Sequence, residues 1–122
     1  MAKKLVECRV AVRPRWRVMC GSEVALGPGR VELLEHIAET GSLRLAAARM
    51  DMSYMRAWTI VKSLNGSFRM PLVEASRGGK SGGGARLTDA GRKVVASYRK
   101  MEKQSENAVR ETWRKLRGLL RP

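Results

Sequence analysis

The 122-residue sequence is poor in the residues that build metal and redox sites. It has two cysteines and one histidine. Cys8 and Cys20 form no Cys-x-x-Cys pair, and His36 falls in the middle of a helical pattern, so no metal or redox motif is present. We expect the cysteines to be buried structural thiols rather than members of a catalytic Cys–His pair.

Long hydrophobic runs are also lacking. The Met-Ala-Lys-Lys start has no apolar stretch of signal-peptide type, and no segment reaches the length of a transmembrane helix. The expectation is a cytoplasmic protein with reduced cysteines. No paired carboxylates and no nucleophile–base pair stand out, so we expect no enzymatic activity, no cofactor and no metal.

Acidic residues are few. Eleven Asp and Glu face 25 Lys and Arg, which gives a formal charge of +14 and an isoelectric point near 11.1. Such a balance favours a polyanionic partner, nucleic acid before membrane. The acids of the central region, Glu32, Glu35 and Glu39, fall in one helical pattern. The basic residues gather at the N-terminus, in a glycine-rich loop and in the last helical pattern, and would orient the domain on a phosphate backbone.

Residues 1–26 show alternation of period two. Apolar Val6, Cys8, Val10 and Val12 alternate with charged or small residues over Leu5–Arg13. The pattern repeats at Trp16, Val18 and Cys20, a turn follows at Gly21-Ser22, and a return strand could begin at Val24. Period two is typical of strands with one buried face, so the sequence predicts a small antiparallel sheet ahead of the helices.

Three helical patterns follow. The first runs from Pro28 to Gly41, with Ser42 as N-cap of the next. The second and third, Leu43–Met50 and Ser53–Asn65, are separated only by Asp51 and Met52. Two short helices joined by so brief a turn must cross steeply, which predicts a helix-turn-helix.

The third helix has two faces at about 100° per residue. The predicted core face is Tyr54, Ala57, Val61 and Leu64, flanked by Trp58 and Ile60. A contact of the Tyr54 hydroxyl with phosphate is the alternative for that residue. The opposite face of this helix is too polar to be buried in the core. Because the N-terminal residues of a recognition helix approach base edges, we expect base contacts from Ser53, Met55, Arg56 and Thr59, and a phosphate contact from Lys62.

The segment from Leu72 to Thr88 reads as strand, glycine loop, strand, which predicts a wing. Five glycines within 78–84 permit close approach to an anion, and Arg77, Lys80 and Arg86 supply the charge. Gly79-Lys80-Ser81 is not part of a nucleotide-binding loop, since Glu74 stands where that motif needs glycine and glycines stand where it needs a helix. The alternative interpretation, that this glycine-rich segment is a plain flexible loop, remains open.

A long helix is predicted from Thr88 as N-cap to about Leu120. At about 30 residues and 45 Å it exceeds what so small a domain can cover, so a homodimer is expected. The alternative is a frayed tail past Leu116. The expected dimer residues share an apolar stripe: Val94, Val95, Tyr98, Met101, Val109, Trp113, Leu116 and Leu120.

Several motifs between Gly27 and about Ala96 resemble one known family. They are Gly27–Arg30, Thr40–Leu43, Ala46–Ala48, Ser53-Tyr54, Ala57-Trp58, Leu72–Glu74, Gly78–Ala85 and Leu87–Gly91. Together they resemble the DNA-binding region of the ModE family of molybdate-responsive regulators and, more distantly, LysR-type winged helices. The resemblance implies a winged helix-turn-helix, a dimer, transcriptional control, and DNA contacts by Ser53, Tyr54, Arg56 and wing residues Gly79, Lys80, Ser81 and Gly82.

The sequence departs from that family in two ways. Full-length members add C-terminal molybdate-binding domains, which we expect to be absent here together with their oxyanion site. The N-terminal β pattern also differs from the helical start of the longest-studied members.

The resulting prediction is a mainly α fold with small β elements in three parts. Residues 1–26 form a β segment, 27–91 the winged helix-turn-helix DNA-binding domain, and 92–122 a dimerisation helix. We expect sequence-specific DNA binding by a transcriptional regulator. The alternatives are a sequence-indifferent architectural DNA-binding protein, or an interaction module for a separate effector-sensing partner.

Overall fold

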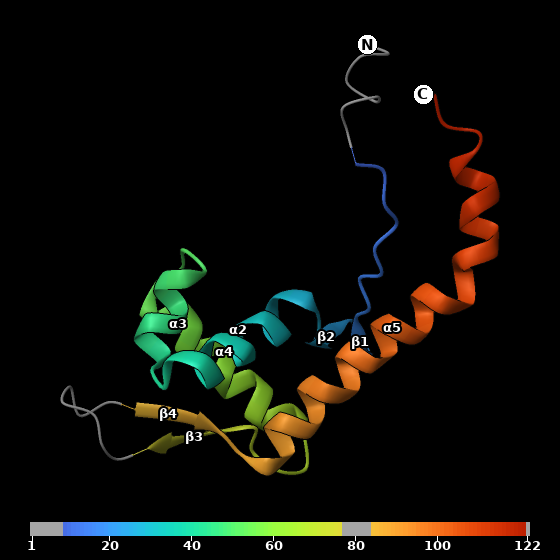
Figure 1. Ribbon diagram of the computed structural model, residues 1–122. Helices are drawn as coiled ribbons and strands as arrows, with labels where there is room; N and C mark the ends of the chain where they lie inside the picture. Colours follow the sequence, from blue (N-terminus) through green and yellow to red (C-terminus); the bar gives the residue numbers. More distant parts are fainter. Residues whose placement is uncertain (1–8, 77–83, 122) are drawn as a thin grey trace.

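Four helices and two small antiparallel sheets make up the computed structural model, which describes residues 9–76 and 84–121 (Figure 1). The prediction of a mainly α fold with small β elements is confirmed. In chain order the elements are β1 (Val18–Cys20), β2 (Glu23–Leu26), α2 (Pro28–Thr40), α3 (Leu43–Arg49), α4 (Tyr54–Ser67), β3 (Val73–Ser76), β4 (Gly84–Leu87) and α5 (Asp89–Arg117).

Local capping sets the helix boundaries. Gly41 ends α2 in the left-handed region, at φ 68°, and its N–H donates to the Ile37 carbonyl. The hydroxyls of Ser42, Ser53 and Thr88 each accept a hydrogen bond from a main-chain N–H three residues later, at 3.0–3.1 Å. These caps confirm the helix starts predicted at Ser42 and Thr88.

The core is centred on α2. Val31, Leu33, Leu34 and Ile37 are fully buried, and the other helices and the wing strands close around them. Asn65 ties α4 to the start of β3, because its side-chain oxygen accepts from the N–H groups of Leu72 and Val73 and its amide donates to the Val73 carbonyl.

The wing is an antiparallel pair, β3 with β4, that runs from Val73 opposite Leu87 to Ser76 opposite Gly84. Ala85 N–H donates to the Gly41 carbonyl at 3.0 Å, which fastens β4 to the corner between α2 and α3. A Cβ at Gly84 would lie 2.9 Å from the main-chain carbonyl oxygen of Ser76, which cannot rotate away, so this strand position favours glycine. The two predicted wing strands are confirmed, and their connecting loop, 77–83, lies outside the described residues.

The N-terminal segment corrects two expectations. Residues 9–17 form no strand, and pairing starts only at Val18, because β2 offers a partner to Val18–Cys20 and to nothing earlier. The buried face expected in this region is absent from β1, whose three residues are exposed. Cys20 is exposed as well, so the expectation of a buried thiol is wrong for that residue, whereas Cys8 lies outside the described residues.

The long helix α5 packs on the domain with its first part and projects beyond it with the rest (Figure 1). Val94 and Val95 pack against the core, and Tyr98 is only 1% exposed. Arg99 fastens the helix to α2 through a hydrogen-bonded ion pair with Glu35. Within residues 9–76 and 84–121, no helix is both long enough and apolar enough to cross a membrane.

Candidate nucleic-acid interface

A tight turn sets the angle between α3 and α4. Asp51 adopts a left-handed conformation, at φ 54°, and Met52 N–H donates to the Ala47 carbonyl at 3.0 Å. Ser53 then starts α4 as its N-cap. Ala57 and Leu64 are the fully buried residues of α4, so one narrow stripe of this helix holds it to the domain and its opposite side is free.

The exposed side of α4 carries two aromatic residues that the sequence pattern assigned to the core. Tyr54 is 50% exposed and Trp58 is 43% exposed, so the core assignment is wrong for both. The Lys62 ammonium lies 5.2 Å from the centre of the Trp58 ring, a cation–π distance.

The residues expected to contact bases lie together on the first two turns of α4. Met55, Arg56 and Thr59 are exposed, and Ser53 is engaged as N-cap. The Thr59 hydroxyl donates to the Met55 carbonyl at 2.9 Å, which leaves its lone pairs to accept from a base. The helix contains no Asp or Glu, so nothing on it repels phosphate.

In the wing, Arg86 is the one expected contact that lies within the described residues. Its Nε donates to Glu74 at 2.8 Å across the strand pair, and both side chains are exposed. Arg86 is therefore already paired with a carboxylate and would have to leave Glu74 to bind phosphate through that nitrogen. Arg77, Gly79, Lys80, Ser81 and Gly82 lie outside the described residues.

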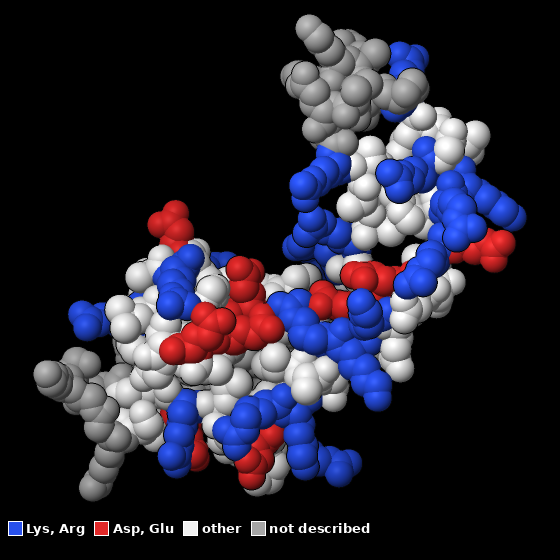
Figure 2. Space-filling view, in the orientation of Figure 1, with Lys and Arg blue, Asp and Glu red and all other residues white. Residues whose placement is uncertain are grey.

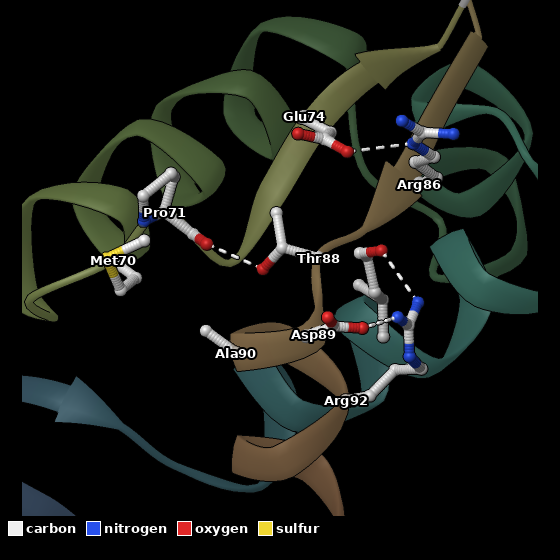
Figure 3. Close-up of a pocket in the computed structure, with 9 residues that line it drawn as sticks. Met70, Pro71, Glu74, Arg86, Thr88, Asp89, Ala90 and Arg92 are labelled. Carbon is white, nitrogen blue, oxygen red and sulfur yellow. Dashed lines mark hydrogen bonds and ion pairs between the residues drawn. The ribbon is translucent and has the colours of Figure 1, made fainter.

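A hollow of about 530 Å³ lies where the base of the wing meets the start of α5 (Figure 3). Its charged groups are already paired, Glu74 with Arg86 and Asp89 with Arg92, and the Thr88 hydroxyl donates to the Pro71 carbonyl. Its two carboxylates are therefore neutralised. The hollow offers neither a free acid–base pair nor excess positive charge.

Acidic and basic side chains lie on different surfaces of the molecule. Figure 2 shows acidic side chains gathered over α2, with basic side chains over α5. Glu32 and Glu39 are exposed on α2, the helix in which the acids of the central region were expected to fall. Arg99 bridges the two groups by pairing with Glu35 and with Glu102, which raises its pKa above the ordinary value.

A basic cavity was missed by sequence reasoning. Arg15, Arg17, Arg30 and Arg56 line a hollow of about 480 Å³ beside the start of α4. The sequence placed a basic segment at the N-terminus, but only the folded chain brings its arginines next to α4.

The apolar stripe of α5 that was expected to form a dimer falls into two groups, one packed within the monomer and one left at its surface. Tyr98 is buried within the monomer and its hydroxyl donates to the Trp16 carbonyl, so its prediction as a dimer contact is wrong. Val94 and Val95 are partly buried against the same core. The outward members that remain are Met101, Val109, Leu116 and Leu120, which are exposed, and Trp113, which is half-buried.

Three helices in this order, with a steep α3–α4 turn and a two-stranded wing, define a winged helix-turn-helix protein. Residues 29–92 match the model of the "Bacterial regulatory helix-turn-helix protein, lysR family". The chain belongs to this family, and its helix-turn-helix region is ModE-like.

The named relatives are molybdenum-related proteins. The chain is 44% identical over 77 residues to "Molybdenum-pterin-binding protein MopA" of Rhodobacter capsulatus. The aligned region covers 63% of this chain and 29% of that protein. It is 41% identical over 85 residues to "Molybdenum transport protein ModE" of Azotobacter vinelandii, which covers 70% and 32%. The chain thus spans about a third or less of the length of these relatives.

A solved structure shares the fold. The "Crystal structure of CbnR_DBD-DNA complex" matches with a TM-score of 0.56 at 19% identity, over 72% of this chain and 95% of that one.

Proposed function

We propose that this chain binds duplex DNA sequence-specifically as a bacterial transcriptional regulator, with α4 in the major groove. The observation that carries the proposal is the exposed first half of α4, where Met55, Arg56 and Thr59 stand out from a helix without acids. The ModE-like sequence and the fold shared with a DNA-bound domain support it. Major-groove reading by the N-terminal part of such a helix follows from its dimensions.

The wing contributes affinity rather than sequence choice. Strands β3 and β4 pair up to Ser76 and Gly84, and the sequence between them carries the basic residues Arg77 and Lys80 among glycines. Contacts to phosphate position a protein on DNA without reading sequence. Arg86 acts here only if DNA displaces Glu74 from it.

The chain functions as a homodimer through the outward side of α5. A dimer would present two copies of α4 to half-sites about one helical turn apart. Of the expected residues, those still available are Met101, Val109, Trp113, Leu116 and Leu120. A non-enzymatic, cytoplasmic protein fits this role.

Selection of binding sites from random duplexes, followed by a salt titration, tests the proposal. We expect one enriched motif with twofold symmetry. With roughly 6–10 phosphate contacts per dimer, affinity should fall by about three to five decades between about 50 and 200 mM salt. Enrichment of no motif would favour the architectural alternative, and a nearly flat salt response would contradict DNA binding itself.

A further inference from the structure

Four arginines from three separate elements meet around one cavity. Arg15 and Arg17 come from the segment before β1, Arg30 from the first turn of α2, and Arg56 from the first turn of α4. The cavity, about 480 Å³, also includes Gly27 to Gly29 and parts of the α3–α4 turn. It therefore lies directly beside the N-terminal half of the recognition helix.

Their positions are supported by contacts. Arg30 Nη1 donates to the Ser63 hydroxyl of α4 at 2.9 Å, so it lies along that helix. The Cγ of Arg17 would lie 3.7 Å from a Cβ placed on Gly27, which puts the stem of Arg17 over the start of α2. The N-terminal segment is itself fastened to α5, because the Trp16 carbonyl accepts from Tyr98 and the Trp16 indole donates to Ser105.

Within the part of the chain that the structure describes, no acidic side chain compensates the positive charge of this cluster. No Asp or Glu lines the cavity. Among residues 9–76 and 84–121, the arginines in ion pairs are others, namely Arg49, Arg86, Arg92 and Arg99. Like charges held within about 10 Å of one another repel at ordinary ionic strength, and a bound anion would relieve that repulsion.

We propose that Arg15, Arg17 and Arg30 clamp the phosphate backbone beside the major groove that α4 reads, with Arg56 at the boundary between the clamp and the base-reading surface. This rests on the proposed function and extends it to the N-terminal segment, which gains a role in DNA binding. Guanidinium groups suit it, because their planar fork binds phosphate oxygens in pairs. The clamp strengthens binding to every sequence alike, since phosphates carry no base identity.

The test is a triple variant, Arg15→Gln, Arg17→Gln and Arg30→Gln, which removes the charges and keeps most of each stem. The matched control, Arg110→Gln, Arg114→Gln and Arg117→Gln, removes the same formal charge from exposed positions far along α5. Melting curves confirm that both variants fold. Each lost phosphate contact lowers the slope of log K against log salt by roughly 0.9, so the clamp variant should lose about two to three units per protomer.

Phosphate ethylation interference locates the contacts. Wild type should show interference at phosphates flanking the selected site that disappears in the clamp variant and persists in the control. An unchanged interference pattern, or a salt slope equal to that of the control, would overturn the clamp while leaving sequence-specific binding intact. Failure of the wild type to bind duplex DNA would instead refute the proposed function. Calorimetry with inorganic phosphate is the last arm: micromolar binding of the free ion would assign the cavity to a small anion and also overturn the clamp.

Discussion

The hydroxyl of Tyr98 on α5 donates a 2.8 Å hydrogen bond to the main-chain carbonyl of Trp16, 82 residues earlier in the chain. This bond joins the long helix to the N-terminal segment, and burial raises the pKa of the Tyr98 phenol above its ordinary value of 10.0. The nearby carboxylate of Glu102 acts in the same direction, whereas Arg99 and Arg15 act against it.

Tyr98→Phe should lower the free energy of unfolding by about 0.5–1.5 kcal/mol at neutral pH, the usual net value of a hydrogen bond. Because the pKa of Tyr98 is raised on folding, the unfolded chain ionises first. The stability that this phenol contributes is complete below pH 10.0 and is lost as pH rises through the higher folded-state pKa. Denaturation at increasing alkaline pH should therefore narrow the gap between wild type and Tyr98→Phe. A gap that stayed constant would contradict this, and Tyr54→Phe, at a half-exposed site, is the control.

Gly91→Ala should destabilise the fold by about 1–3 kcal/mol, as overpacking does. An added Cβ would lie 2.2 Å from the Leu72 carbonyl oxygen, where α5 crosses the start of the wing. Gly66→Ala on α4 is the matched control, since nothing lies within 4 Å of its added Cβ. It should raise stability by about 0.5–1 kcal/mol through helix propensity. Chemical denaturation of both variants checks the opposite signs, and equal effects would mean that the contact at Gly91 is wrong.

How much of this fold could be predicted from the sequence depends on how far apart along the chain the interacting residues lie. Helix starts at Ser42 and Thr88 were predictable because a cap and the amide it serves are three residues apart. The strand expected over Leu5–Arg13 is absent from its described part, residues 9–13, because pairing needs a partner that alternation does not reveal.

The candidate site was predictable only in part. The polar side of α4 was located correctly, but period alone could not tell whether Tyr54 and Trp58 face the core or solvent. Tyr98 fits an outward stripe on α5 as well as it fits a core. The Tyr98 hydroxyl bonds to Trp16, 82 residues earlier, and the cavity of four arginines likewise joins segments that are far apart in the chain.

Arg56→Ala should weaken binding to the selected DNA site by about 1–3 kcal/mol and binding to random duplex by less, because an arginine on the reading face distinguishes bases. Lys80→Ala, in the loop outside the described residues, should weaken both about equally. Competition titrations with specific and random duplexes measure the two effects. If Arg56→Ala reduced both affinities alike, Arg56 would belong wholly to the phosphate clamp.

We expect the 122-residue chain to bind no molybdate tightly. The hollow at the wing base already pairs its charges internally, so it offers no uncompensated cation to an oxyanion. Calorimetric titration of the chain with molybdate checks this. Micromolar affinity would refute the prediction, and repeating the titration with the triple Gln variant would show whether the arginine cavity is responsible.

The last prediction concerns the dimer. Met101→Asp and Leu116→Asp should each convert the intact chain from dimer to monomer at about tens of micromolar. Both residues are exposed and apolar, Met101 near the middle of α5 and Leu116 near its end, and burying such side chains contributes about 1.5–3 kcal/mol each. Lys115→Asp, on the exposed position next to Leu116, introduces the same carboxylate, with an even larger change in net charge, and removes no apolar side chain, so it should leave the dimer in place. Sedimentation equilibrium distinguishes the states, and the monomers should bind a symmetric DNA site weakly because only one copy of α4 engages at a time. A wild-type chain that sedimented as a monomer at these concentrations would overturn the dimer, and the exposed side of α5 would then be the place to look for a separate partner protein.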